Sequence, residues 1–571
     1  MNNQPFYSMH KLVTTLLIII GFSSCTSETS NLISFTVSPV IVDGENQLKI
    51  KLRCHAEADG ETTLLFQDAV WGQDSMHNVI ASMRLLNAEG QVTKNKDSGW
   101  IQITHPKELE VLEFEYQILQ DTPKELTTKT DSRPIIQPEY FHVFSHSLFM
   151  LPKETIATTN DNLDVHIQWA GFPDEYALQN SFGSNLNEQS IRGISEEKFH
   201  TALFAGGDLR IHDIDIQGNQ VVFATRGEWE VFQDSTLVNI LENTMTVQRN
   251  FWKDHSQPYF SVTMMPTVQK QGSSFHGTGL TNSFSLTASN NQFLEVEGLA
   301  YLVNHELQHN WIGTLIKNVN EEEQYWFSEG FTDYFTIKNM AVHEIYNLDK
   351  NFFVKEFNTF MRALFTSPVK DAPNSEINYD NFWSSRDYSK LPYHRGALFA
   401  FYLDHKIGKD SKGEYNLDHV MLDIKKAAET SGQKLTHSYF IETVDAYLAE
   451  SIKPFFDTHI EQGELMDLTE IYTEFGLEFE PTSQVFDLGF EFSEDNLSIA
   501  SIDPNSEAYK AGLRQGDRLG RRSIYYGSLT NKAEFTVVRN GEEVPVSYYP
   551  ITEAPIPQLK ATDNNFKNLT F

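Results

Sequence analysis

The pentapeptide His305-Glu306-Leu307-Gln308-His309 constrains this chain more than any other feature, and it lies in a segment whose apolar residues have helical spacing. A spacing of four places both histidines on one helix face, one turn apart, where they can chelate one metal ion. Glu306 can act as the base that takes a proton from an attacking water. This short pattern also occurs by chance, so a functional site needs a further ligand elsewhere in the chain.

A catalytic zinc site needs a third protein ligand and keeps one open position. The segment Trp326–Tyr334 reads WFSEGFTDY and places Glu329 20 residues after His309, which leaves room for one helix to end and another to begin. We therefore predict that His305, His309 and Glu329 hold one Zn²⁺. Asp333 lies four residues after Glu329 and is predicted to accept the outer N–H of a ligating histidine.

Together these segments resemble the gluzincin metallopeptidases, which implies a thermolysin-like, mainly helical catalytic domain. Two branches share the pattern: the aminopeptidase-N-like enzymes and the glycyl aminopeptidase family, which carries a C-terminal PDZ domain. The 19 residues between His309 and Glu329 favour the second branch. The run from Tyr393 to Ala397 is similar to a segment in which a tyrosine stabilises the tetrahedral intermediate, so the resemblance implies a catalytic role for Tyr393.

Upstream of the metal motif, the stretch from Gly272 to Ser283 departs from both branches. Gly277 and Gly279 would let a substrate backbone approach a strand edge, and Thr281 is a further candidate for substrate contact. Both branches carry a glutamate here that binds a free amino terminus, but this stretch has none. A neutral side chain would lose a charge-assisted hydrogen bond to an ammonium group. The sequence therefore leaves open whether the chain removes amino-terminal residues, cleaves internal bonds, or has only a turn-rich hairpin here.

The whole chain is expected to be a multidomain α+β protein. Short alternating apolar runs predict an all-β domain over residues 26–167, and helical spacing dominates the peptidase-like region 168–475. Residues 480–555 resemble a PDZ domain, with Leu488-Gly489-Phe490 as its carboxylate-binding loop. Its groove would bind a C-terminal peptide, or the fold would serve only for packing. Residues 556–571 are predicted to be a loose polar tail.

The first 25 residues are predicted to be a targeting signal and not part of the fold. An apolar run of 11 residues, Leu12–Phe22, follows a single lysine and precedes Ser23, Ser24 and Cys25. The run resembles a bacterial lipobox, which implies a lipid anchor at Cys25 and a place in the bacterial cell envelope, periplasmic or at the surface. The alternative is a plain signal peptide cut near Ser24. Membrane contact is expected only through the lipid.

The charge balance excludes one class of partner. The chain has 44 Lys and Arg against 78 Asp and Glu, for a net charge of −34, which disfavours nucleic acid. A peptide or protein substrate is expected instead. The leading hypothesis is a zinc metallopeptidase, and more finely a glycyl-type aminopeptidase. The alternatives are a zinc endopeptidase, a PDZ-led binding protein with an inert peptidase domain, and a zinc hydrolase acting on something other than peptides.

Overall fold

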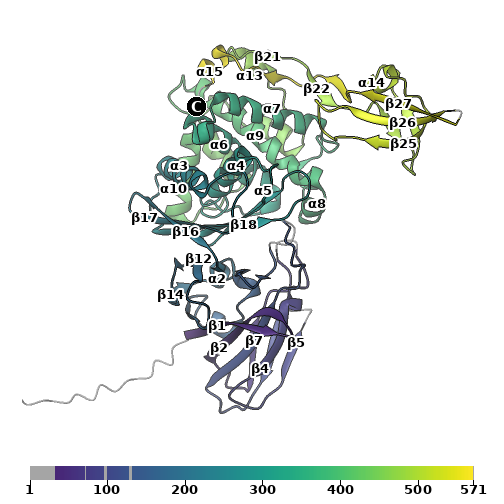
Figure 1. The fold of residues 1–571 in the computed structure, drawn as a ribbon. Helices are drawn as coiled ribbons and strands as arrows, with labels where there is room; N and C mark the ends of the chain where they lie inside the picture. The colour runs from purple at the N-terminus through teal and green to yellow at the C-terminus, as the bar shows by residue number, and fades with distance from the viewer. Residues whose placement is uncertain (1–31, 71–72, 96–98, 128–131, 540, 570–571) are drawn as a thin grey trace, which may run out of the picture.

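The computed structural model describes residues 32–70, 73–95, 99–127, 132–539 and 541–569, and these form three units (Figure 1). A β unit lies at one end, a helical unit occupies the middle, and a small β unit near the C-terminus projects to the side of the far end. The predicted multidomain α+β organisation, with an N-terminal β domain and a following helical domain, is confirmed. The predicted signal segment with Cys25 lies outside the described residues.

The N-terminal unit is built from three sheets, with strand orders β14-β11-β1-β2-β7-β4, β10-β3-β6-β5 and β13-β12-β15-β9-β8. Alternating side chains of β1 and β2 enter its core, and the Asp43-Gly44 turn joins the two strands with positive φ at both residues, as Asp-Gly hairpins require. The elements of this unit are β1 (Leu32–Val42), β2 (Glu45–His55), β3 (Glu61–Leu65), β4 (Ile80–Leu85), β5 (Val92–Asn95), β6 (Trp100–Thr104), β7 (Val111–Leu119), β8 (Ile135–Ile136), β9 (Tyr140–Phe144), β10 (Leu151–Pro152), α1 (Lys153–Thr158), β11 (Leu163–Trp169), β12 (Ala177–Asn180), β13 (Gly183–Ser184), β14 (Glu188–Ile194), α2 (Glu196–His200) and β15 (Leu203–Gly207).

These sheets continue beyond residue 167, the end that the sequence predicts for the β domain. Strand β14 pairs with β11, and β15 pairs with β9, so the β unit extends to Gly207. The short strands in this stretch find their partners far away in the chain, and period-2 patterning does not reveal such pairing. The helix α2 lies within this added segment, between β14 and β15, and reaches the helical unit.

The helical unit opens with a five-stranded sheet of order β16-β17-β18-β20-β19, with β16 and β19 at its two edges. Strands β17, β18 and β20 are mutually parallel, and β19 runs antiparallel to β20. The elements are β16 (Arg210–Ile216), β17 (Asn219–Thr225), α3 (Asp234–Trp252), β18 (Tyr259–Thr267), β19 (Phe275–Leu280), β20 (Ser283–Ser289), α4 (Val296–Gln308), α5 (Glu321–Ser328), α6 (Gly330–Val342), α7 (Lys350–Thr366), α8 (Tyr379–Ser384), α9 (Arg386–Asp410), α10 (Leu417–Ser431), α11 (His437–Asp445), α12 (Lys453–Phe456) and α13 (Thr469–Glu474).

Two glycines bring α9 unusually close to the junction between α5 and α6. A Cβ atom on Gly396 would lie 1.9 Å from the carbonyl oxygen of Trp326, and one on Gly330 would lie 2.4 Å from the Cα of Gly396. Both contacts involve backbone atoms, which cannot rotate away as side chains do. Helix α9 therefore packs backbone against backbone on the α5–α6 junction, and only glycine fits at either position.

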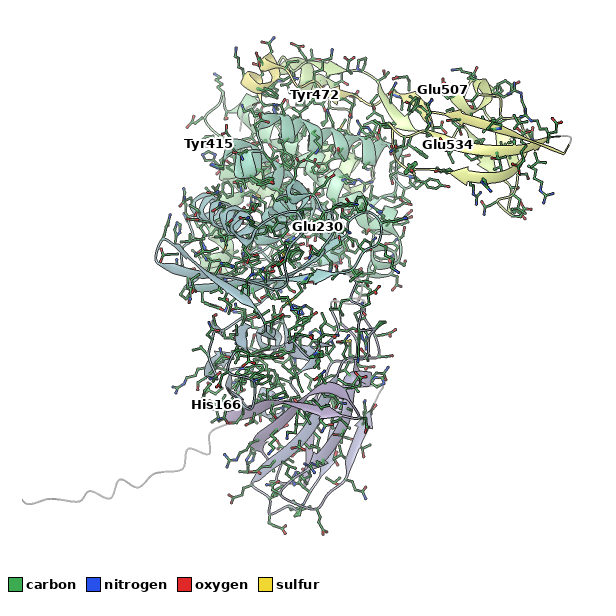
Figure 2. All side chains as sticks on the ribbon, in the orientation of Figure 1. His166, Glu230, Tyr415, Tyr472, Glu507 and Glu534 are labelled. Atoms are coloured by element: carbon green, nitrogen blue, oxygen red, sulfur yellow. The ribbon has the colours of Figure 1, made fainter. Side chains whose placement is uncertain are left out.

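The C-terminal unit has its own small apolar core, which includes Leu513, Phe535 and Val537. Glu507 and Glu534 lie in this unit, whereas Tyr472 lies in the helical unit beside it (Figure 2). The remaining elements are β21 (Phe479–Glu480), β22 (Ser483–Phe486), β23 (Phe490–Phe492), β24 (Ile499–Ile502), α14 (Glu507–Lys510), β25 (Arg518–Ser523), β26 (Ala533–Arg539), β27 (Glu542–Tyr548), β28 (Ile551–Ala554), β29 (Gln558–Leu559) and α15 (Asp563–Asn568).

The final segment, expected to be a loose tail, packs on the helical unit as far as the described residues extend. The side-chain amide of Asn358 on α7 donates to the carbonyl of Leu559 at 2.8 Å and accepts from its N–H at 2.8 Å. Asn565 is fully buried and bonds to the backbone at Glu478 and Lys560. These contacts are non-local, so the polar composition of the segment did not predict them.

Among the described residues, no helix combines the length and apolar character needed to cross a membrane.

The glycine contact between α9 and the α5–α6 junction predicts that glycine-to-alanine substitutions at two positions of α9 change stability by different amounts. Gly396→Ala should destabilise the helical unit by about 1–3 kcal/mol or more, because the new Cβ overlaps a backbone carbonyl. Gly408→Ala on the same helix is the matched control, since its Cβ would find its nearest neighbour at 3.9 Å. That change should be neutral or slightly stabilising. Thermal unfolding measures both; equal midpoints for the two variants would contradict the close packing.

Candidate metal centre and active site

Three side chains converge on one point at the end of α4 and the start of α6. His305 lies in the last turn of α4, His309 directly follows this helix, and Glu329 occupies the junction between α5 and α6. The Nε2 atoms of the two histidines are 3.2 Å apart. The Oε2 atom of Glu329 lies 3.4 Å from Nε2 of His305 and 3.7 Å from Nε2 of His309. The structure therefore brings together the three predicted ligands within the spacing of a single metal site.

The outer nitrogen of each histidine has a hydrogen-bond acceptor. His305 Nδ1 lies 2.8 Å from Oδ1 of Asp333, and His309 Nδ1 lies 3.0 Å from the carbonyl oxygen of Ile312. When Nδ1 carries the proton and donates, the Nε2 lone pair of each ring points at the common centre. Asp333 thus occupies the position predicted for it, one helical turn beyond Glu329.

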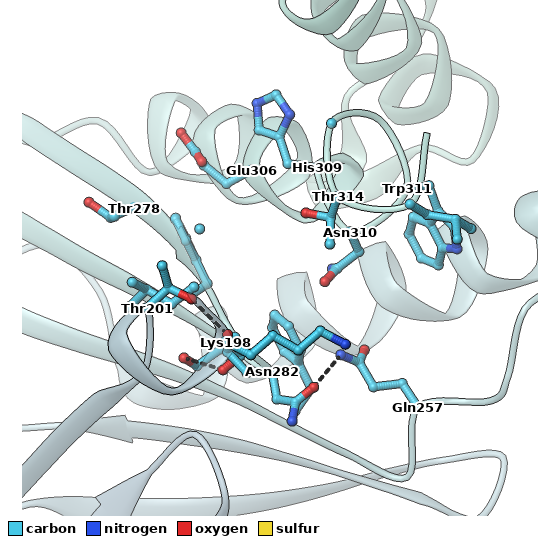
Figure 3. Close-up of a pocket in the computed structure, with 18 of the residues that line it drawn as sticks. Lys198, Thr201, Gln257, Thr278, Asn282, Glu306, His309, Asn310, Trp311 and Thr314 are labelled. Atoms are coloured by element: carbon cyan, nitrogen blue, oxygen red, sulfur yellow. Dashed lines mark hydrogen bonds between the residues drawn. The ribbon is translucent and has the colours of Figure 1, made fainter. Parts of the chain in front are cut away.

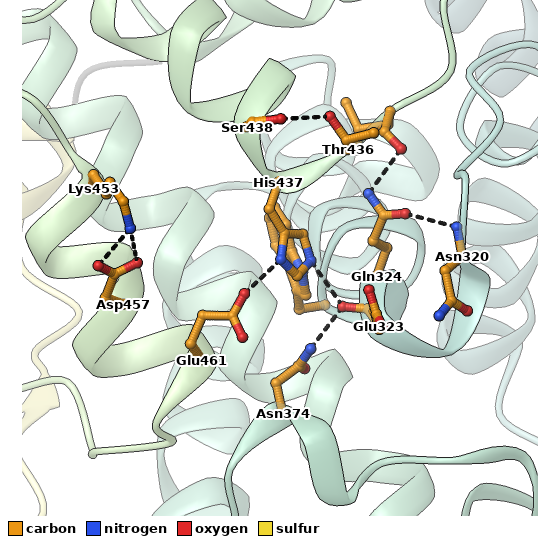
Figure 4. Close-up of polar contacts among 12 residues, drawn as sticks. Asn320, Glu323, Gln324, Asn374, Thr436, His437, Ser438, Lys453, Asp457 and Glu461 are labelled. Atoms are coloured by element: carbon orange, nitrogen blue, oxygen red, sulfur yellow. Dashed lines mark hydrogen bonds and ion pairs between the residues drawn. The ribbon is translucent and has the colours of Figure 1, made fainter.

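Helix α5, which leads to Glu329, is held by polar contacts from distant parts of the chain (Figure 4). The carbonyl of Glu323 accepts hydrogen bonds from Nδ2 of Asn374 at 2.7 Å and Nε2 of His437 at 3.1 Å. The other ring nitrogen of His437 pairs with Glu461 at 2.5 Å. These bonds fix the first turn of the helix that leads to Glu329, so the ligand position depends on three separate segments.

The donor set fits a zinc ion. Two imidazole lone pairs and a carboxylate oxygen converge here, and that oxygen of Glu329 is buried with no hydrogen-bond partner among the described residues. Only a cation, either a proton or a metal ion, satisfies such a cluster. Burial would lower the pKa of His305, but Asp333 and Glu329 outweigh it and raise that pKa to about 10 in the metal-free site. The same negative surroundings favour a dication, and two histidines with one carboxylate are a donor set of catalytic zinc.

Glu306 borders the same cavity as the ligands, and Gly277 on β19 lies directly against it. A Cβ on Gly277 would come 3.1 Å from Cγ of Glu306 and 2.6 Å from the ring of Phe284. Gly279, in contrast, has no atom within 4 Å of the equivalent position. Gly277 therefore makes room for Glu306 and Phe284, whereas Gly279 leaves open space beside the strand edge.

Tyr393 on α9 stands over the metal centre. Its ring stacks on that of His305 at a centroid distance of 6.0 Å and an angle of 11°, and its hydroxyl interacts with the carboxylate of Glu329. Burial, together with the charges of Glu329 and Asp333, raises the pKa of Tyr393 well above its usual value. The phenol therefore keeps its proton near neutral pH and can donate it to an oxygen that becomes negative.

Thr281, the third predicted substrate contact, is already engaged by the N-terminal unit. Its hydroxyl is 2.8 Å from that of Thr201, and its N–H donates to the carbonyl of Thr201 at 2.9 Å. Figure 3 shows the partner Thr201 on the opposite side of the cavity from Glu306 and His309. Gly277, Gly279 and Thr281 all line the cavity, but the side chain of Thr281 is committed to a bond between units.

One residue of the centre was missed from the sequence. The hydroxyl of Tyr301 donates to Oδ1 of Asp333 at 2.5 Å, so Asp333 receives bonds from both Tyr301 and His305. The signal was present, because Tyr301 precedes His305 by one helical turn and shares its face. Ile312 contributes only its carbonyl, and no side-chain pattern could have identified it.

Comparisons with known proteins agree with this centre. Residues 247–459 match the family described as Peptidase family M1 domain, a span that contains the predicted ligands, Glu306 and Tyr393. Leucine aminopeptidase 2 of Ajellomyces capsulatus is 31% identical over 136 residues, which cover 22% of this chain and 20% of that protein. Leukotriene A-4 hydrolase of Xenopus laevis is 27% identical over 165 residues, covering 26% and 24%. The chain thus spans a quarter or less of the length of these relatives.

The fold as a whole has a solved counterpart. The crystal structure of an aminopeptidase N family protein from Idiomarina loihiensis aligns with a TM-score of 0.71 at 15% identity, covering 94% of this chain and 100% of that one. At this identity the likeness establishes the fold alone. The domain match and the relatives support the predicted aminopeptidase-N-like peptidase domain around the His305, His309 and Glu329 cluster, and the solved structure shares the overall fold.

The bond from Asp333 to His305 predicts an effect on metal affinity. Asp333→Asn removes the negative charge while keeping the shape, so His305 becomes a weaker ligand and zinc affinity should fall about 10–100-fold. Glu306→Gln is the matched control, because Glu306 borders the centre without being a ligand, and its zinc affinity should stay within about threefold of the parent. Competition with a chromophoric chelator measures both. An unchanged affinity in Asp333→Asn would contradict the assigned role.

Proposed function

We propose that the protein is a zinc-dependent peptidase that hydrolyses peptide bonds, and more finely an aminopeptidase of the glycyl aminopeptidase type. One observation carries the proposal: three convergent ligands, His305, His309 and Glu329, lie beside Glu306 in a cavity of about 1030 Å³ bordered by the edge strand β19. A general base beside a metal site can activate water, and a free strand edge can hold an extended peptide beside it.

In the proposed reaction a bound metal ion, two side chains and one strand each have a separate role. Zinc, when bound, supplies a Lewis acid that polarises the scissile carbonyl and lowers the pKa of water. Glu306 takes a proton from the attacking water and returns it to the departing amine, so that no net proton is consumed within the step. The hydroxyl of Tyr393 turns from Glu329 to the carbonyl oxygen as negative charge develops there. The backbone of β19 holds the substrate as an added strand, with Gly279 leaving room for its side chains.

A second candidate function, cleavage of internal bonds, is favoured by Thr281. Its side chain is bonded to Thr201 and carries no charge that could hold a free ammonium group. Glu197 also lines the cavity, but it is exposed and lies 3.8 Å from Lys317. An aminopeptidase would therefore have to recognise the amino terminus by other means, whereas an endopeptidase has no such need.

For the C-terminal unit we propose a PDZ domain. Its support is the resemblance around Leu488-Gly489-Phe490 and the helix α14, which Ser506 caps by accepting from the N–H of Tyr509 at 3.2 Å. The N–H of Gly489 donates to Oδ1 of Asp487 at 2.7 Å, so one donor of the supposed carboxylate loop is already occupied by an anion. This favours a packing role over capture of C-terminal peptides, and with it an active peptidase over an inert binding protein.

The location of the protein is proposed from the sequence alone. Residues 1–25 support export and a lipid anchor at Cys25 in a bacterial cell envelope, with the folded units held outside the membrane.

The test is mass spectrometry of a mixed peptide library digested by the purified protein, with Glu306→Gln and a chelated sample as controls. We expect zinc-dependent cleavage that both controls abolish. Products that lose one amino-terminal residue at a time would establish the aminopeptidase, and internal cuts would establish the second candidate. Absence of zinc-dependent cleavage of any peptide would overturn the proposed function.

A further inference from the structure

The active-site cavity extends past β19 to a wall that carries positive charge. Lys198 on α2 lines this wall, is exposed, and forms no ion pair and donates no side-chain hydrogen bond among the described residues. Figure 3 shows its side chain extended across the cavity floor beside Asn282 and Gln257, with Glu306 and His309 above. The chain has 78 Asp and Glu against 44 Lys and Arg, so most of its lysines can find an acidic partner, and Lys198 forms no such ion pair among the described residues.

A second cation of the same cavity is buried. Arg249 on α3 is only 1% exposed, and its Nη1 group has no hydrogen-bond partner among the described residues. Its Nη2 group donates to the carbonyl of Gln257 at 3.5 Å, a long bond. A guanidinium offers five N–H donors, and when buried it normally meets a carboxylate. No carboxylate of the described chain forms an ion pair with it. The charge of Asp254 acts on it only from a longer distance, so Nη1 is left buried and without a partner.

Gln257 contacts the buried cation Arg249 and also Asn282 on the cavity wall. Its carbonyl accepts from Arg249, and its side-chain Nε2 donates to Oδ1 of Asn282 at 3.4 Å. Lys198 lines the same cavity and extends toward Gln257 in the view of Figure 3. The three side chains Lys198, Arg249 and Gln257 therefore form one region of the wall, which we call the cationic subsite.

The acidic side chains that line the cavity are already paired or belong to the metal centre. Asp254 accepts from Nε1 of Trp311 at 2.9 Å and from Ser256, and Glu197 lies 3.8 Å from Lys317. Glu306 and Glu329 belong to the metal centre. An ammonium group that reached the cationic subsite would meet like charge, whereas a carboxylate would gain charge-assisted hydrogen bonds.

We propose that the cationic subsite binds a carboxylate of the peptide substrate, so that the cavity selects peptides bearing a negative charge on the side of β19 that faces α2. The inference rests on the proposed peptidase function. The carboxylate comes either from an acidic side chain or from the free C-terminus of a short peptide, and both sources offer the same two oxygens.

Binding to the zinc-loaded Glu306→Gln protein tests the proposal without turnover. Isothermal titration would compare alanine-based hexapeptides with Glu or Gln scanned through each position, each with a free or an amidated C-terminus. Removing the recognised carboxylate should weaken binding about tenfold, and the difference should shrink at high salt. Loss on Glu→Gln identifies a side chain, and loss on amidation identifies the C-terminus.

Variants assign the effect to the subsite. Lys198→Met, made in the same background, should reduce the ratio of acid to amide affinity to near one, whereas Lys51→Met, an exposed lysine on β2 away from the cavity, should leave the ratio unchanged. Equal affinity for acid and amide peptides at every position would overturn the proposal, as would equal effects of the two lysine variants. Cleavage by the parent protein without such a preference would refute the subsite alone; charge-selective binding without any cleavage would refute the proposed function and leave the subsite standing.

Discussion

The close approach of α9 to the α5–α6 junction is the constraint on which the candidate site depends. Gly330 and Gly396 allow two backbones to touch, and each borders a functional residue: Glu329 precedes one glycine, and Tyr393 lies one turn before the other. Without that contact the tyrosine could not stack on His305 while its hydroxyl reaches Glu329. A backbone contact that contains no functional side chain therefore determines the geometry of the chemistry.

Electrostatic balance organises the cavity in the same way. At one end, lone pairs of His305, His309 and Glu329 face each other with no internal cation, and a metal ion resolves the conflict. At the other end, Lys198 and Arg249 line the cavity, and neither forms an ion pair within the described part of the chain. The folded chain neutralises neither group of charges. A metal ion would neutralise the first, and a carboxylate of the substrate would neutralise the second.

The metal centre was predictable and its surroundings were not, for a physical reason. The ligands His305 and His309 follow from the fixed geometry of one helix turn, and Asp333 follows Glu329 by the same rule. Lys198 and the end of the β unit at Gly207 depend on contacts between segments far apart in the chain, which local periodicity does not encode. The sequence alone shows that this stretch lacks a glutamate. It does not show that the side chain of Thr281 is hydrogen-bonded to Thr201 of the N-terminal unit.

The most direct test of the central claim is to titrate zinc into metal-free protein while measuring peptide hydrolysis and bound metal in the same sample. Activity should rise with zinc to a plateau at one ion per chain, and Glu306→Gln should bind the same single ion while losing about 10²–10⁴-fold in rate. Hydrolysis that is independent of zinc, or that survives in the Glu306→Gln protein with one ion bound, would contradict a metallopeptidase built on these residues.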